Sequence, residues 1–401
     1  MRAPKSWIAE LVDLPKSISD QEIADALVRV GFEVEEVITQ GAGLKGPLVV
    51  GKVLAIEELK EHKKPIRYVE LDCGEGQSRF VICGAQNFKV GDLVVVSLPG
   101  AVLPGGFAIS ARETYGKTSN GMICSSRELG LGDDHSGIIV LPEGKPGQDA
   151  IELLQINDTI FDIAVNPDRG YALSIRGIAR EIAASLGLSY RDPAKVSIDF
   201  KDSGTPVTAK IADGADVMYL RTLQNFDPAA SSPIWIRSRL EKCGMRSISL
   251  AVDITNYVML ELGQPLHAFD AETIDGFLEI RRAKDSKKLK TLDGVDRELN
   301  PDDLVVADRK SVLALAGTMG GANSEISDKT TRIAVEAVHF DAISIAKNSR
   351  RHKLSSEASR RFERGVDPTL AEISSARASQ LLIELGGAQY VGTSTVGKPN
   401  F

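Results

Sequence analysis

One short segment of the sequence gathers several side chains that can hydrogen-bond to a ligand. Residues 252–270 read VDITNYVMLELGQPLHAFD and contain Thr255, Asn256 and His267 around a Gly-Gln-Pro turn. Buried polar groups need hydrogen-bond partners, and a plain core helix or strand offers few of them. The segment therefore predicts a pocket for a polar ligand. The simpler alternative for His267 is a packed ring after a turn.

Two later segments carry further candidates. In GTMGGANS (317–324), backbone N–H groups of Gly320 and Gly321 can surround an anion, although a tight turn is the simpler interpretation because the Gly-Lys-Ser/Thr ending of a phosphate loop is missing. Glu336 is the one carboxylate of the apolar run IAVEAV (333–338). It needs a partner if that run is a central strand, and it faces water if the strand is half exposed.

Basic residues concentrate in two places of an otherwise acidic chain. A run of this kind is usually a solvated helix face, and neutralisation of RNA phosphates is the functional alternative. The larger cluster comprises Lys347, Arg350, Arg351, Lys353, Arg360, Arg361 and Arg364, and the smaller one comprises Lys60, Lys63, Lys64 and Arg67. As RNA contacts we predict Lys63, Lys64, Arg67, Arg350, Arg351, Arg360 and Arg361.

No metal site is predicted. The four cysteines lack CxxC spacing and are expected to be reduced thiols in the cytoplasm. The histidines form no HExxH pattern, and the sequence Asp133-Asp134-His135 lies between glycines, which favours a solvated turn over a metal ligand set.

Size and composition bound the kind of protein. The chain has 401 residues, of which 43% are hydrophobic and 26% charged, with a net charge of −7. That length allows two to four domains with separate cores. No run of about 18 apolar residues exists, so no membrane span is expected. The negative charge means that nucleic-acid binding would depend on local basic patches.

The helices and strands that must position these residues are predicted from capping residues and from the spacing of apolar residues. Ser19 and Glu22 predict a capping box, and Gly187 ends a helix predicted over 171–186. Short apolar runs with Gly and Pro turns over 45–150 predict a small barrel or sandwich. From about residue 207 a second α/β region begins. Its predicted strands are Phe277–Arg282, Leu304–Ala307, Val312–Ala316 and Ile333–Ala337.

The three candidate segments, together with several long motifs in the same order, resemble the beta-subunit family of bacterial phenylalanine–tRNA ligases. These further motifs are VICGAQNFKVGD (81–92), LPGAVLPGGF (98–107), SNGMICSSRELGLGDDHSGI (119–138) and VNPDRGYALSIRGIARE (165–181). The resemblance implies a multidomain α+β fold. An oligonucleotide-binding (OB-type) barrel at 41–150 would be inserted in a small α+β domain (1–40 plus 151–190). A larger α/β B3/B4 editing domain would follow at 207–385, and residues 386–401 would begin a further domain.

The resemblance also implies roles for the candidate residues. A phenylalanine pocket rejects tyrosine, which adds one hydroxyl, by only about 100-fold, so the family removes wrongly attached tyrosine at a second site. There His267, Thr255, Asn256, Gly320 and Gly321 would form the catalytic group. Substrate would be bound by Glu336, Ala337, Ser356 and Ala358, with the Glu336 carboxylate accepting a hydrogen bond from the tyrosine hydroxyl.

The partners implied are tRNA(Phe) and an alpha subunit in an α2β2 ligase that uses ATP and Mg2+ for the synthetic reaction. That reaction belongs to the alpha subunit, and neither ATP nor Mg2+ is expected on this segment. Two alternatives stay open from the sequence. One is a tRNA-binding scaffold without chemistry, and the other is a free-standing deacylase.

Overall fold

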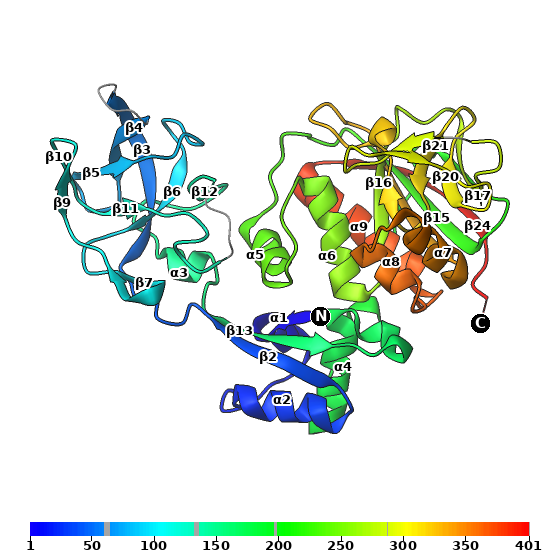
Figure 1. Cartoon of the computed structure of the whole chain (residues 1–401), viewed down its shortest axis with the longest axis horizontal. Helices are drawn as coiled ribbons and strands as arrows, with labels where there is room; N and C mark the ends of the chain where they lie inside the picture. The colour runs from blue at the N-terminus through cyan, green and yellow to red at the C-terminus, as the bar shows by residue number, and fades with distance from the viewer. Residues whose placement is uncertain (60–64, 132–135, 196–198, 287, 401) are drawn as a thin grey trace.

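The chain forms three groups of elements that Figure 1 shows side by side. The computed structural model describes residues 1–59, 65–131, 136–195, 199–286 and 288–400. An N-terminal domain carries an inserted sheet on one side and a C-terminal domain on the other (Figure 1). The predicted multidomain α+β class is therefore confirmed. No helix in those described ranges is long and apolar enough to cross a membrane.

The N-terminal domain combines two stretches of chain that lie far apart in sequence. β1 and β2 both pair antiparallel with β13, in the order β1-β13-β2, so residues 41–157 are an insertion between strands of one sheet. Its elements are β1 (Arg2–Pro4), α1 (Lys5–Leu11), α2 (Asp20–Arg29), β2 (Glu33–Gln40), β13 (Asp158–Ala164) and α4 (Ile175–Leu186). Ser19 and Glu22 form the predicted capping box, and Gly187 is the left-handed C-cap of α4.

The insertion contains one six-stranded sheet and two small two-stranded sheets, β7-β8 and β9-β10. The six-stranded sheet has the order β11-β6-β3-β4-β5, with β12 also pairing with β6. β5 and β11 contact each other, but no ladder joins them within the described residues, so the predicted barrel is a half-barrel. Its elements are β3 (Leu48–Leu59), β4 (Ile66–Asp72), β5 (Ser78–Cys83), β6 (Leu93–Ser97), β7 (Val102–Leu103), β8 (Phe107–Ala108), β9 (Arg112–Thr114), β10 (Lys117–Ser119), β11 (Met122–Ile123), β12 (Val140–Leu141) and α3 (Ala150–Leu153).

The C-terminal domain consists of two facing sheets. One has the order β14-β17-β20-β21-β22 and the other the order β16-β23-β15-β24. The first contains β14 (Thr208–Ile211), β17 (Phe277–Arg282), β20 (Leu304–Ala307), β21 (Val312–Leu315) and β22 (Met319–Gly320). The second contains β15 (Ala215–Gln224), β16 (Leu266–Asp270), β23 (Ile333–Phe340) and β24 (Gln389–Gly397). A hairpin of β18 (Lys288–Lys290) and β19 (Asp296–Glu298) lies between β17 and β20 in sequence.

The second sheet is buried on both faces. Alternate residues of β23 point to opposite sides: Ile333 and Val335 join one core with the helices, while Ala334 and Val338 join another with the five-stranded sheet. This explains why the run reads as continuously apolar. The helices of the domain are α5 (Ile234–Lys242), α6 (Leu250–Leu262), α7 (Ala342–His352), α8 (Glu357–Phe362) and α9 (Leu370–Gly386).

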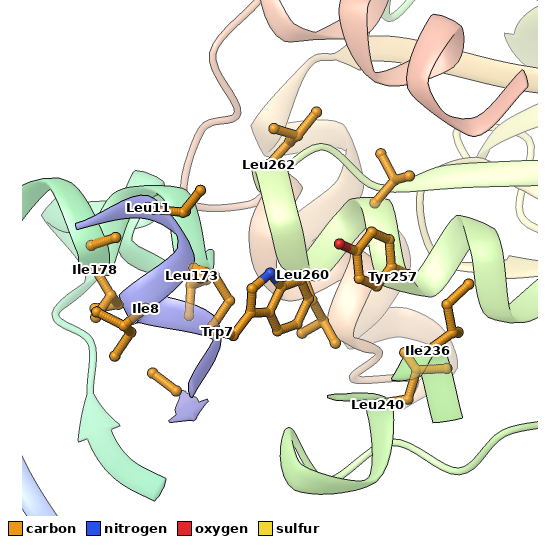
Figure 2. Close-up of a cluster of buried hydrophobic side chains, with 14 of the residues drawn as sticks. Trp7, Ile8, Leu11, Leu173, Ile178, Ile236, Leu240, Tyr257, Leu260 and Leu262 are labelled. Carbon is orange, nitrogen blue, oxygen red and sulfur yellow. The ribbon is translucent and has the colours of Figure 1, made fainter. Parts of the chain in front are cut away.

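The N-terminal and C-terminal domains share one hydrophobic core. Trp7 of α1 stacks on Tyr257 of α6, with ring centroids 4.9 Å apart and planes 13° from parallel. Figure 2 shows these two rings between side chains from α1 and α4 on one side and side chains from α5 on the other. Nearby, Lys242 of α5 forms a buried ion pair of 2.8 Å with Asp158 of β13.

The last strand corrects one prediction. Residues 386–401 were expected to begin a further domain, but β24 pairs antiparallel with β15 from Val217 to Gln224 and is the edge strand of the second sheet. The strand has nine residues but mixes Thr, Ser and Gly with only a few apolar residues, so its place in this sheet depends on its long-range pairing rather than on a local signal.

Candidate functional site

A cavity of about 480 Å³ opens between the two sheets of the C-terminal domain. Its walls come from β16 and β23 on one side, from β20, β21 and β22 on the other, and from α6 and α8. Four of the predicted catalytic residues line it, namely Thr255, Asn256, His267 and Gly320, together with the predicted substrate contacts Glu336 and Ala358. The fold thus brings together residues that lie up to about a hundred positions apart in sequence.

Glu336 and His267 are direct cross-strand partners. His267 of β16 lies opposite Glu336 of β23 in an antiparallel ladder. Directly opposed residues of a ladder point to the same face of the sheet, and both side chains line the cavity. The sheet therefore sets the spacing of the carboxyl and the imidazole.

The Glu336 carboxyl is buried without a hydrogen-bond partner. Its side chain is 5% exposed, and its Oε1 atom has no partner among the described residues. Because burial disfavours the charged form, the pKa of Glu336 is raised to about 8. A buried and unsatisfied carboxyl is costly. Because the carboxyl lines a cavity, its partner would have to come from a molecule that occupies the cavity.

His267 is held as a neutral imidazole. Burial lowers its pKa to about 4. The ring lies edge-on to Phe269 at a centroid distance of 4.4 Å. The chain passes close by at Gly320, where an added Cβ would lie 2.6 Å from Cε1 and 2.8 Å from Nε2 of His267. Glycine is required at position 320 because any side chain there would displace the imidazole.

The polar pair on α6 presents different groups to the cavity. The Thr255 hydroxyl donates to the carbonyl oxygen of Val252 at 2.7 Å, so only its lone pairs remain for a ligand. The Asn256 carboxamide has no hydrogen-bond partner within the described chain. Asn256 can therefore both donate to and accept from a bound molecule.

Three predicted site residues lie outside the cavity. The N–H of Gly321 donates to the Leu313 carbonyl at 2.7 Å and cannot face an oxyanion. Ala337 points to the opposite face from its neighbour Glu336, because side chains alternate along β23. Ser356 is the N-cap of α8, and its hydroxyl accepts from Ser359 N–H at 3.0 Å, whereas Ala358 does reach the cavity.

The predicted RNA contacts divide into buried and exposed groups. Arg361 is wrong as a phosphate contact, because its side chain is 1% exposed and donates to the Leu173 carbonyl at 3.0 Å and to Glu357 at 2.7 Å. Arg360 lies 3.6 Å from Glu357, and Arg351 is paired with the buried Asp303. Arg350 is exposed and has no ion pair to a described residue.

In the half-barrel, Arg67 is committed to the protein itself. It forms an ion pair of 2.8 Å with Glu58 and donates to the Phe88 carbonyl at 2.9 Å. Lys63 and Lys64 lie outside the described residues, as does the sequence 133–135 that was weighed as a metal ligand set. Elsewhere in the described chain, no group of three or more His, Cys, Asp or Glu side chains is placed to hold a metal ion.

Sequence reasoning missed several residues at the cavity mouth. Arg246, Ile248, Leu292 and Glu325 all line the cavity and are exposed. Arg246 and Ile248 stand just before α6, which carries Thr255 and Asn256. In the sequence, only their closeness to Thr255 and Asn256 could have predicted a place at the cavity. Ordinary loop residues can lie equally close to such a pair.

Comparison with known proteins gives two family models. Residues 48–149 match the model described as a putative tRNA binding domain, and residues 214–387 match the B3/4 domain. Among solved structures, a likeness is found to an N-terminal fragment of the phenylalanyl-tRNA synthetase beta-subunit from Pyrococcus horikoshii. That likeness has 11% identity and a TM-score of 0.27, and covers 50% of this chain and 62% of the other.

Curated relatives match almost the entire chain. It is 56% identical over 397 residues to the phenylalanine–tRNA ligase beta subunit of Thermobifida fusca and 55% identical over 411 residues to that of Streptomyces avermitilis. These matches cover 97% and 100% of this chain but 48% and 49% of the relatives, so the chain spans about half their length. The chain belongs to the phenylalanine–tRNA ligase beta subunit family and contains its tRNA-binding and B3/4 regions.

Proposed function

We propose that the cavity hydrolyses tyrosine from wrongly charged tRNA(Phe). The observation that carries the proposal is the Glu336 carboxyl, which is buried in the cavity wall without a partner. The hydroxyl of a bound tyrosine side chain would donate to it. Phenylalanine has no such group and would leave the carboxyl unsatisfied. The cavity would therefore prefer tyrosine, whereas the phenylalanine pocket of the synthetic site prefers phenylalanine.

The hydrolysis needs positioned water rather than a side-chain nucleophile. The aminoacyl ester is already activated. Water adds to its carbonyl carbon, the bond to the ribose oxygen breaks, and a proton passes to that oxygen, giving free tyrosine and the tRNA hydroxyl. His267 is neutral near pH 7 because its pKa is about 4, so a ring nitrogen is available to accept a hydrogen bond from the attacking water. The Asn256 carboxamide and the Thr255 oxygen would orient the ester and ribose.

For the intact protein, we propose the β role in an α2β2 phenylalanine–tRNA ligase. The relatives are beta subunits, which supports an alpha-subunit partner, and the matched tRNA-binding region supports contact with tRNA(Phe). The synthetic reaction would use ATP and Mg2+ on the alpha subunit. In the described part of this chain no cluster of metal-ligating side chains fits Mg2+, and no step is assigned to it here.

The test measures release of each amino acid from Tyr-tRNA(Phe) and Phe-tRNA(Phe) by the chain and by its Glu336→Ala variant. Loss of a hydrogen bond to a buried carboxyl should reduce the ratio of the two kcat/KM values by about 10- to 100-fold. tRNA binding should be unchanged, which a filter-binding assay checks. Equal selectivity of the two proteins would remove Glu336 from recognition. Tight tRNA binding without any release, in this chain and in the α2β2 complex, would favour the scaffold alternative.

A further inference from the structure

The segment 165–181 of the N-terminal domain packs against a wall of the cavity. Its sequence, VNPDRGYALSIRGIARE, covers η2 (Pro167–Ala172) and the first turns of α4. All of these residues belong to the described part of the chain, and none of them lines the cavity. The backbone of residues 165–173 instead contacts α8 and the turn after it, and α8 supplies two residues of the cavity wall. The segment is therefore one step removed from a bound substrate.

The loop 165–174 is fixed to its own domain. Arg169 donates to the Val30 carbonyl at 2.6 Å, and its guanidinium lies over the ring of Phe32, 4.9 Å from the centroid. Ser174 is the N-cap of α4, and its hydroxyl donates to the Tyr171 carbonyl at 2.7 Å. These contacts hold the loop on the N-terminal domain, so the loop keeps its position relative to that domain.

Two arginines join α8 to this loop. Arg361, whose side chain is 1% exposed, donates from Nε to the Leu173 carbonyl at 3.0 Å. Arg364, just after α8, donates to the Val165 carbonyl at 2.7 Å. The two backbones also approach closely at Gly170, where an added Cβ would lie 2.8 Å from the Arg364 carbonyl oxygen. The loop therefore contacts α8 and its following turn at three points.

The other side of α8 faces the cavity. Ala358 and Phe362 lie one turn apart and both line the cavity. The Phe362 ring lies edge-on to Phe340 at a centroid distance of 5.0 Å, and Phe340 is on the same strand and the same face as Glu336. α8 has six residues, and so short a helix is not stable alone. Its position depends on its contacts, and the loop 165–174 supplies those on the side away from the cavity.

We propose that Arg361 and Arg364 are positioning residues through which the N-terminal domain fixes the cavity wall formed by Ala358 and Phe362. The inference rests on the proposed function, because this wall would confine the aromatic ring whose hydroxyl donates to Glu336. Neither arginine lines the cavity. Their effect on hydrolysis therefore passes through the fit of the tyrosine side chain and leaves the water at its place in the site.

The test changes the loop and measures the cavity. Gly170→Ala should push the loop away from α8, since the new methyl group has no room beside the Arg364 carbonyl, and the backbone at Gly170 is not left-handed. KM should rise about 10-fold for both Tyr-tRNA(Phe) and tyrosine methyl ester, while kcat stays unchanged, as expected for lost substrate binding. Arg364→Gln, which removes one of the three contacts, should raise KM in the same way but less.

Gly84→Ala is the matched control, because a Cβ there meets nothing within 4 Å; both constants should equal those of the parent. A role in stability alone predicts a different result. A partly unfolded variant contains fewer active molecules, so its apparent kcat falls while KM stays constant. That pattern in Gly170→Ala, or parent values of both constants, would overturn the proposal.

A second measurement does not need catalysis. In a chain with labelled alanine methyl groups, Gly170→Ala should shift the resonance of Ala358 but not that of Ala55 in the half-barrel. An unshifted Ala358 resonance would overturn the proposal. If the parent hydrolyses neither ester, the proposed function fails. Titration with tyrosine methyl ester, followed at Ala358, then replaces KM: about 10-fold weaker binding by Gly170→Ala supports the positioning role, and equal binding overturns it.

Discussion

Glu336 and His267 face each other across the β16–β23 ladder and project into the same cavity. The carboxyl and the imidazole are thereby held on adjacent strands of one sheet. In the proposed function, the carboxyl recognises the distal end of the tyrosine side chain, and the imidazole orders water at the ester. A shift of either strand would disturb both tasks together, since the ladder fixes their separation.

The pH dependence of stability should report the burial of Glu336. Its pKa is raised from 4.5 to about 8 in the folded chain, so the folded state holds a proton that the unfolded state has lost between these values. The stability contributed by that proton is fully present below about pH 4.5 and is lost as pH rises toward 8. Thermal unfolding should therefore show a steeper loss for the parent chain than for Glu336→Gln between pH 5 and 8.5. Parallel curves would contradict the burial.

The rate of deacylation should be insensitive to protonation of His267 in the neutral range. Since its pKa is about 4, the ring stays neutral from pH 5.5 to 8. Single-turnover release of tyrosine should show no acid limb near pH 6.5, and His267→Asn should slow it by about 100-fold. An acid limb near pH 6.5 that disappears in the variant would show that the imidazole titrates normally.

Gly320→Ala should abolish deacylation while the domain stays folded. The new methyl group would lie 2.6 Å from a ring carbon of His267 and 3.1 Å from Leu292 Cδ1, closer than real contacts allow, so the imidazole must move. Gly84→Ala is the control, because a Cβ at Gly84 meets nothing within 4 Å. Circular dichroism and the single-turnover rate decide the outcome. A Gly320→Ala variant with the parent rate would mean that the position of His267 is not critical.

Arg361 should contribute to stability and not to RNA affinity. Arg361→Met leaves the Leu173 carbonyl without its donor and frees Glu357; we expect a loss of about 1–3 kcal/mol in the free energy of unfolding. Arg360→Gln, at a more exposed position of the same helix, should change stability little. Urea unfolding measures both. The slope of tRNA affinity against salt should be the same for Arg361→Met and the parent, because no phosphate contact is lost.

Local signals predicted the fold well where a few neighbouring residues decide the structure. The capping box of Ser19 and Glu22 and the C-cap Gly187 both appear as expected. Each of these caps depends on a short stretch of chain whose chemistry has few alternatives. For Glu336 the sequence left two alternatives open, and the structure shows the buried one.

The failures concern properties that only distant contacts determine. Arg361 looked like its basic neighbours, but it is buried because the N-terminal domain covers that side of α8 with the Leu173 carbonyl. β24 took an edge position whose partner, β15, lies some 170 residues earlier. Ala337 is different, because the two-residue period of a strand already places it on the opposite face from Glu336.

Thr255 and Asn256 face the cavity, while the next residue of α6, Tyr257, stacks on Trp7 of the N-terminal domain. A single turn of helix is thus both the wall of the pocket and the joint between two domains. The first 40 residues therefore support, through α1, the helix that forms one wall of the cavity. A B3/4 region without the N-terminal domain would expose one side of this helix to solvent. A movement of the N-terminal domain would shift the same helix and, with it, the wall of the cavity.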